Sequence, residues 1–210
     1  AVNSDAVQVG YYHVFDSEAN VLRYKEMINP WYEDNPDLDL SSYVLPRDWV
    51  LLENGTVLFT YSGISSSETS IDTGVMCFDE NDEFQWYQDW RTEYVERAYA
   101  ITVLNDEVFV VIETWPTELV IDNEISIHRF SMEGELLATY SEEELIAGFG
   151  GELNLTNAKE LLSDEEAFVM VGSIIQFPGY SSDPAMTKFD SDLNLLWSSH
   201  IDMQWGNGRQ

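Results

Sequence analysis

One segment of the chain recurs four times, and this repetition constrains the fold more than any other feature. Each copy has an apolar alternating run that ends in Phe, then a cluster of Asp, Ser, Glu, Asn or Gly, then a second apolar run. The four phenylalanines lie 63, 52 and 59 residues apart, at Phe15, Phe78, Phe130 and Phe189. Two such runs joined by a short polar cluster are typical of antiparallel strands with a tight turn. The sequence therefore predicts four related β-hairpins.

A second kind of hairpin precedes three of these copies. Its turns lie 24, 25 and 25 residues before the next Phe, at Asn54, Asn105 and Asp164. Because the spacing is nearly constant, we expect the two hairpins to form one four-stranded unit. Repeated units of about 40 to 60 residues with four antiparallel strands are the blades of a β-propeller. We predict an all-β, β-propeller-type fold of about three and a half blades, with a half blade at 7–28 and whole blades at 43–90, 98–140 and 155–201.

The repeated pattern also resembles a known group of propellers. An apolar strand, Phe-Asp, a turn and an apolar strand that often ends in Trp are similar to the repeats of quinoprotein-like and arylsulfotransferase-like proteins, over most of residues 7–201. The resemblance implies a fold and not a chemistry. An arylsulfotransferase-like enzyme would use a His nucleophile with Arg partners in a central funnel, and no local motif here matches that site. A quinone cofactor would require an adjacent cysteine pair, whereas the chain has Cys77 alone.

The number of predicted strands leaves the ring unfinished. The chain opens on the third strand of a blade and closes on a fourth, so residues 1–210 form one propeller-like domain that is a partial ring. We expect apolar sheet surface at both ends, which something must cover. A second copy would bring the total to seven blades, and a larger chain or assembly, which we favour, is the other solution.

Charge restricts the partners of this chain. Nine Lys and Arg residues accompany 39 Asp and Glu residues, which gives a net charge of −30 and a pI of about 4.1. A field of this sign repels phosphate and anionic lipid headgroups, so we expect no nucleic acid partner. The longest uncharged apolar run near the C-terminal end covers 14 residues, over 167–180, and is too short to span a bilayer, so we expect no membrane insertion. The excess favours salt adaptation in a secreted, extracellular or periplasmic setting, although acidity also serves solubility alone. Ala1 is either a mature terminus or the boundary of an excerpt.

The predicted loops on one face of the sheets are the place where we expect a binding site. They are much longer than the opposite turns, and run over 29–47, 62–74, 113–124, 140–157 and 172–184. Long loops on a rigid scaffold usually carry function. Their aromatic residues are the candidate ligand contacts, namely Trp31, Tyr32, Trp115, Phe177 and Tyr180. Beside carboxylates such as Glu113 and Asp183 they could stack on sugars or receive a basic protein surface. Alternatively, the rings close the blades and the carboxylates form a solvated rim.

The remaining motifs point to structure rather than to catalysis. His13 and His128 each precede a repeat Phe by two residues, which indicates a shared structural position. Cys77 lies in an apolar run and is expected to be a buried, inert thiol. The Asp-rich turns at 79–83 and 190–194 could hold Ca²⁺, but hairpin turns favour these residues anyway, and we expect no cofactor or metal site. A capping box at Ser141 predicts a short helix over 141–148.

These observations lead to a functional expectation with one alternative. We expect a non-catalytic, extracellular or surface binding and scaffold module, with no catalytic residues. It would recognise a protein or a glycan through its long-loop face and associate with another chain or copy. The alternative is a secreted or periplasmic propeller enzyme, an arylsulfotransferase-like transferase or a hydrolase, with its site in the central funnel.

Overall fold

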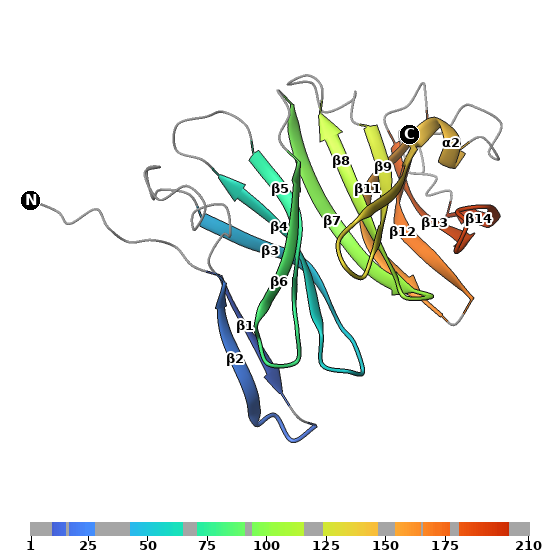
Figure 1. The fold of residues 1–210 in the computed structure, drawn as a ribbon. Coiled ribbons are helices and arrows are strands. Elements are labelled where there is room, and N and C mark those ends of the chain that lie inside the picture. The colour runs from blue at the N-terminus through green and yellow to red at the C-terminus, as the bar shows by residue number, and fades with distance from the viewer. Residues whose placement is uncertain are drawn as a thin grey trace, which may run out of the picture. The chain divides into compact units, whose positions relative to one another are not determined.

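The fold is described from a computed structural model of the chain (Figure 1). The structure describes residues 10–15, 17–27, 43–64, 71–90, 94–115, 124–146, 154–164, 166–176 and 181–201. The chain divides into two compact units, residues 1–98 and residues 99–210.

The described strands form three four-stranded sheets and one two-stranded sheet. In each sheet, strands that follow one another in the sequence lie side by side and run antiparallel. The two-stranded sheet contains β1 (Gly10–Phe15) and β2 (Val21–Met27). The next sheet has the order β3 (Tyr43–Leu51), β4 (Val57–Ile64), β5 (Ile71–Phe78) and β6 (Phe84–Trp90). The expected strands of the half blade and of the first whole blade are therefore present.

Two further sheets follow, and most of their residues lie in the second unit. One contains β7 (Val95–Leu104), β8 (Glu107–Trp115), β9 (Glu124–Ser131) and β10 (Leu136–Ser141). The other contains β11 (Asn154–Ser163), β12 (Ala167–Gln176), β13 (Ser181–Asp190) and β14 (Leu195–His200). A short helix, α2 (Glu142–Ile146), follows β10. Sequence order equals spatial order in every sheet, as simple strand-to-strand hairpins require.

The turn between the third and fourth strand is built in the same way in each copy. The fourth residue after the repeat Phe has a positive φ of 63°, 62°, 84° and 61°, at Ala19, Asp82, Gly134 and Leu193. A left-handed residue at this place is typical of a type I turn with a bulge. The strand register shifts next to each turn, as a bulge requires.

The residue directly after the Phe holds these turns together through its side chain. Asp79 Oδ1 accepts hydrogen bonds from the backbone N–H groups of Asn81 and Glu83, at 2.8 and 2.9 Å. Asp190 Oδ1 accepts the corresponding pair at 3.0 and 2.9 Å. Ser131, which departs from the Asp of the pattern, accepts the same pair through Oγ at 3.2 and 3.3 Å. The repeat therefore depends on an oxygen acceptor at this position and not on Asp as such.

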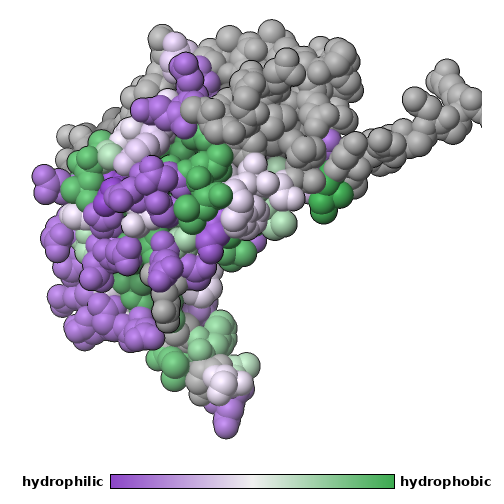
Figure 2. Space-filling view, turned by 90° about the vertical axis from the view of Figure 1, so that its right-hand side faces the viewer, coloured by the Kyte–Doolittle hydropathy of each residue, from purple (hydrophilic) through white to green (hydrophobic). Residues whose placement is uncertain are grey.

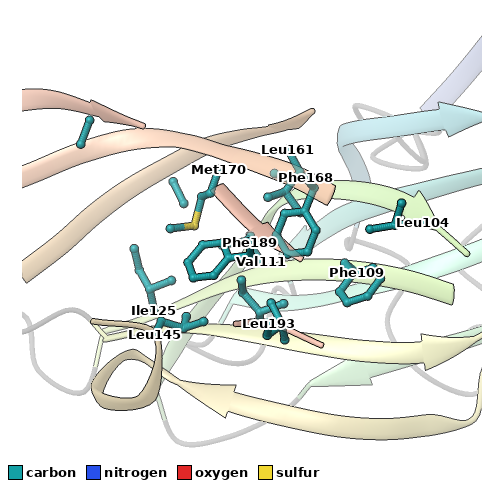
Figure 3. Close-up of a cluster of buried hydrophobic side chains, with 14 residues drawn as sticks. Leu104, Phe109, Val111, Ile125, Leu145, Leu161, Phe168, Met170, Phe189 and Leu193 are labelled. Atoms are coloured by element: carbon teal, nitrogen blue, oxygen red, sulfur yellow. The ribbon is translucent and has the colours of Figure 1, made fainter. Parts of the chain in front are cut away.

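The hydrophobic core of the second unit lies between its two sheets (Figure 3). Phe168 of β12 contacts Phe109 of β8 and Phe189 of β13, with ring centroids 5.1 and 5.7 Å apart. All three side chains are fully buried. Burying one such ring contributes on the order of 1.5 to 3 kcal/mol, and aromatic pairs add about 0.5 to 1.5 kcal/mol. Face-to-face packing of sheets is what the repeated four-stranded units require.

The short helix α2 closes one side of this core. The predicted capping box is present, because Glu144 Oε2 accepts from the Ser141 N–H at 2.8 Å and the Glu144 N–H donates to Ser141 Oγ at 3.4 Å. Glu142 Oε2 accepts from the N–H of Ile125 at the start of β9. Leu145 is 2% exposed and packs into the core (Figure 3). The prediction of a helix after Ser141 is confirmed.

The core of the first unit includes a close approach that requires glycine. Tyr61 of β4 is paired with Gly74 of β5 and is 2% exposed. A Cβ atom at Gly74 would lie 2.6 Å from the Tyr61 ring and 2.3 Å from the carbonyl oxygen of Gln88. A Cβ atom does not approach non-bonded heavy atoms this closely in folded proteins. Gly74 therefore lets the tyrosine ring lie across the β5 backbone beside Phe59 and Met76.

Two of the expected long loops are shorter than the sequence indicated. The connection expected at 172–184 is reduced to 177–180, because β12 continues to Gln176 and β13 begins at Ser181. The connection expected at 62–74 is likewise reduced to 65–70. Gly172 and Pro184, the bounds of the expected loop at 172–184, both lie inside the β12–β13 ladder. The Pro184 carbonyl faces β14, where it accepts from Ile201 N–H at 3.0 Å, so the missing N–H removes no bond to β12.

Candidate functional site

Trp115 is the predicted ligand contact that the structure describes. It is the last residue of β8, half-buried, at the end of the β7–β8 hairpin opposite its turn. The other four candidates, Trp31, Tyr32, Phe177 and Tyr180, lie outside the described residues. Trp115 therefore ends a strand, rather than standing in a loop as the sequence suggested. A side chain on a strand is held more precisely than one on a loop.

Trp115 contacts a side chain of β7, which in turn contacts a side chain of β11. The rings of Trp115 and Tyr99 of β7 make an edge contact, with centroids 6.2 Å apart and planes at 66°. The Nζ atom of Lys159 of β11 lies 4.5 Å from the centroid of the Tyr99 ring. The structure thus places an indole, a phenol and an ammonium group together. We call this group the aromatic–lysine cluster (Tyr99, Trp115 and Lys159).

Local sequence sets the position of each member of the cluster. Asn105 and Asp106 both have positive φ, 53° and 58°, so the β7–β8 hairpin closes with a tight two-residue turn that fixes its register. Thr156 and Glu160 of β11 pair with Ser173 and Val171 of β12, which leaves three residues of β11 opposite one residue of β12. Lys159 lies in this bulge and is exposed. Bulges of this kind re-aim side chains at the end of a sheet.

Two of the carboxylates expected beside the aromatic residues lie within the described residues, and both are buried. Glu113 lies two residues before Trp115, on the same face of β8, and is 1% exposed. Asp183, near the start of β13, is 2% exposed. The interpretation of these two carboxylates as a solvated rim is therefore wrong, because the strands extend past the expected loop boundaries and enclose them. Buried carboxylates require partners within the protein, and both residues have interactions with their surroundings.

The cluster has a defined chemical capacity. The half-buried rings offer apolar faces that are fixed by each other, and Lys159 offers an exposed ammonium group with three donors. The cation–π contact with Tyr99 holds that ammonium group in place and contributes about 0.5 to 1 kcal/mol at an exposed site. Such a group of side chains can pack against an apolar ring and donate hydrogen bonds to oxygen atoms. In the described ranges, no group of three or more His, Cys, Asp or Glu residues is placed to hold a metal ion.

Sequence reasoning missed Tyr99 and Lys159. Tyr99 precedes the apolar run at Ile101 that revealed the hairpin, so its place on β7 had no local signal. Lys159 lies in a bulge, where the two-residue alternation of a strand is interrupted. Its scarcity was a signal that could have been used, since the chain has three lysines in all.

The histidines and the cysteine have structural surroundings. His13 stacks on Phe15 at 5.9 Å and His128 stacks on Phe130 at 6.3 Å, so the position predicted to be shared is shared. Burial lowers the pKa of His128 from 6.5 to about 4. Burial, with a smaller effect from the charge of Asp79, raises the pKa of Cys77 to about 12, so this buried thiol is inert as expected.

The comparisons with known proteins concern the fold. No family model matches the sequence. No curated protein matches it either. Among solved structures, the chain is similar to a subtype N10 neuraminidase-like protein of A/little yellow-shouldered bat/Guatemala/060/2010, with a TM-score of 0.52 and 13% sequence identity. The alignment covers 90% of this chain and 49% of the other, so the chain spans about half the length of the protein it matches.

This similarity agrees with the sheets described above. Neuraminidases are six-bladed β-propellers built from four-stranded antiparallel sheets. The chain is therefore an all-β protein with propeller-type blades, as its repeats predicted. At this level of identity the similarity concerns the fold alone. Within the described residues, no helix is long and apolar enough to cross a membrane.

Proposed function

We propose that the chain is a non-catalytic binding module that holds a glycan on the aromatic–lysine cluster. The observation that carries this proposal is the contact of Trp115, at the end of β8, with Tyr99 of β7, beside the Lys159 ammonium group of β11. Sugar rings have apolar C–H faces that pack on aromatic side chains, and hydroxyl groups that accept hydrogen bonds from lysine. Functional groups are usually placed where loops leave a rigid scaffold.

The charge of the chain selects among glycans. A net charge of −30 repels anionic ligands at long range, whereas a neutral sugar experiences no such repulsion. A neutral oligosaccharide is therefore the ligand that the cluster and the overall field favour together. The same field attracts basic protein surfaces, which makes a basic, aromatic-rich protein the second candidate ligand.

Location and assembly belong to the same proposal. The acidic composition supports a secreted, extracellular or periplasmic module in a saline setting. The half blade supports association with another chain or copy. The resemblance to quinoprotein-like and arylsulfotransferase-like repeats supports the alternative of a transferase or hydrolase, which would turn over an aryl sulfate or a glycoside.

The ligand proposal is tested by a single truncation at the cluster. Wild-type protein is screened on an array of neutral and acidic oligosaccharides, and the best binder is titrated calorimetrically. We expect Trp115→Ala to weaken binding at least tenfold, because a tryptophan that packs on a ligand is a typical energetic centre of an interface. Lys159→Gln should weaken it less, because it removes one donor group and keeps the rings.

A second exposed tryptophan provides the matched control. Trp49 of β3 is 60% exposed and belongs to the other compact unit, so Trp49→Ala should leave the affinity unchanged. Thermal unfolding of all variants verifies that they are folded. Absence of glycan binding by the wild type would contradict the glycan ligand. Turnover of an aryl sulfate or a glycoside would contradict the non-catalytic role.

A further inference from the structure

Equivalent faces of the two sheets of the second unit differ in burial: the face of β7–β10 is covered by the next sheet, and the corresponding face of β11–β14 is not. On the β7–β10 sheet, Phe109, Val111 and Ile127 face β11–β14 and are 0% exposed. The hydrogen-bond register gives the equivalent positions on β11–β14. The pair Phe109–Arg129 on β8 and β9 corresponds to the pair Val169–Lys188 on β12 and β13. The pair Val111–Ile127 corresponds in the same way to Val171–Met186.

The equivalent face of β11–β14 is exposed. Met186 and Trp197 are each 42% exposed and Leu162 is 52% exposed. Side chains directly opposite each other on neighbouring strands share a face, so the register gives one surface. We call it the open face, and its residues are Leu162, Val169, Val171, Met186, Lys188 and Trp197. Figure 2 shows the side on which β13 and β14 lie in Figure 1, where hydrophobic residues lie among hydrophilic ones.

The β1–β2 hairpin presents the opposite kind of face. Phe15 pairs with Val21 as Phe189 pairs with Leu195, next to turns of the same conformation. Phe189 is 0% exposed and lies in the core between the sheets, whereas Phe15 and Val21 are each 54% exposed. The rings of His13 and Tyr24 lie beside Phe15 on this side of the hairpin. We call these four residues, His13, Phe15, Val21 and Tyr24, the hairpin face.

Charge is complementary between the two faces. Where the sheets of the second unit meet, Arg129 of β9 approaches Asp192, in the turn of the following sheet, at 3.8 Å. Lys188 holds the position of Arg129, and Glu18 holds the position of Asp192 in the β1–β2 turn. Each cation is held in place by an ion pair within its own sheet. Lys188 pairs with Asp164 at 2.8 Å, and Arg129 pairs with Glu107 at 2.6 Å. The open face therefore carries a cation, Lys188, where the existing contact has Arg129. The hairpin carries an anion, Glu18, where that contact has Asp192.

We propose that the hairpin face of one copy of this chain packs on the open face of a second copy, with Glu18 of one chain beside Lys188 of the other. The contact repeats the packing that β13 and β14 make on β7–β10. It joins two different surfaces, so assembly is head-to-tail, and copies are added until a ring closes. The inference rests on the part of the proposed function in which the chain associates with another copy, and it is independent of the glycan ligand.

Solution mass tests the proposal. Each copy carries a charge of −30, so association should be measured by sedimentation in 1 M KCl, where charges are screened beyond about 3 Å. Wild-type protein should form oligomers whose mass rises with protein concentration. Phe15→Glu blocks the hairpin face and Met186→Glu blocks the open face, so each variant alone should be monomeric. An equimolar mixture of the two should give dimers that grow no further, because one intact hairpin face then meets one intact open face.

Matched variants separate the head-to-tail contact from a general effect of added charge. Leu137 of β10 is 46% exposed and lies on neither face, so Leu137→Glu should assemble like the wild type. At 0.15 M KCl, Glu18→Lys should weaken assembly and the further change Lys188→Glu should restore it. A wild type that stays monomeric at every concentration would overturn the proposal and assign the open face to another occupant, such as a further blade. A mixture of Phe15→Glu and Met186→Glu that stays monomeric would overturn it too.

The outcome is separable from the ligand test. Trp115→Ala should lose the glycan and still assemble, and Met186→Glu should stay monomeric and still bind the glycan. Loss of glycan binding with normal assembly contradicts the ligand alone, and the reverse result contradicts the head-to-tail contact alone.

Discussion

A single histidine connects the stability of the second unit to pH. His128 of β9 lies on Phe130, with its Nε2 atom 3.1 Å from Ser126 Oγ, and burial lowers its pKa to about 4. The unfolded chain takes up a proton near pH 6.5, and the folded chain does so only near pH 4. The buried, neutral His128 therefore contributes its full stabilisation of the folded state above pH 6.5. This stabilisation is lost as the pH falls from 6.5 to 4.

The replacement that tests this effect is present elsewhere in the chain. Met76 holds the position of His128 in β5 and is fully buried. Between pH 6.5 and 4, the unfolding free energy of the wild type should fall relative to that of His128→Met by up to about 3 kcal/mol, at about 1.4 kcal/mol per pKa unit. Urea unfolding across this pH range measures the difference. Exposed His13→Met should follow the wild type, and parallel curves for wild type and His128→Met would refute the assignment.

At the scale of one element, α2 shows a helix that its neighbours stabilise. Five residues are far too few for a stable isolated helix. Its capping box and the buried Leu145 side chain supply the stability that so short a helix lacks on its own. Leu145→Ala should lower the unfolding free energy by about 2 to 5 kcal/mol and Ser141→Ala by about 1 kcal/mol. Chemical denaturation measures both, with exposed Glu143→Ala as the near-neutral control, and a loss below about 1 kcal/mol for Leu145→Ala would contradict this role.

Comparison of elements also shows what a sequence of this kind reveals. The hairpins were predictable because turn chemistry is local: Asp79 and Asp190 bond to backbone N–H groups within four residues of themselves. The extension of β12 and β13 past Gly172 and Pro184 was not, since the cost of a proline depends on which neighbouring strand its missing N–H faces. Lys159 was missed for a related reason. Its placement follows from a register shift against β12, which no periodicity in β11 reveals.

At the scale of the whole molecule, net charge governs the response to salt. A charge of −30 on 210 residues opposes the compact state, and the range of this repulsion falls from about 10 Å at 0.1 M salt to about 3 Å at 1 M. We expect the unfolding midpoint to rise by at least about 5 °C between 0.1 and 2 M KCl, equivalent to roughly 1 to 2 kcal/mol for a chain of this size. Scanning calorimetry at several salt concentrations measures the rise.

Removing charge should flatten this response. A variant in which four exposed glutamates are changed to glutamine, at Glu53, Glu133, Glu135 and Glu166, keeps side-chain size and lowers the repulsion. Its midpoint should be higher than that of the wild type at 0.1 M KCl and should rise less with added salt. A midpoint of the wild type that does not change with ionic strength would argue against salt adaptation.

The repeated turn after each Phe has a consequence for the history of this chain. Asp79, Ser131 and Asp190 each satisfy backbone N–H groups of their own loops, so the hydrogen bonds that shape each turn lie within its own hairpin. A gene segment that encodes such a hairpin can be duplicated, and the copies can then diverge almost everywhere else. The sequence similarity that remains between the blades is accordingly confined to a few residues around the repeated phenylalanine.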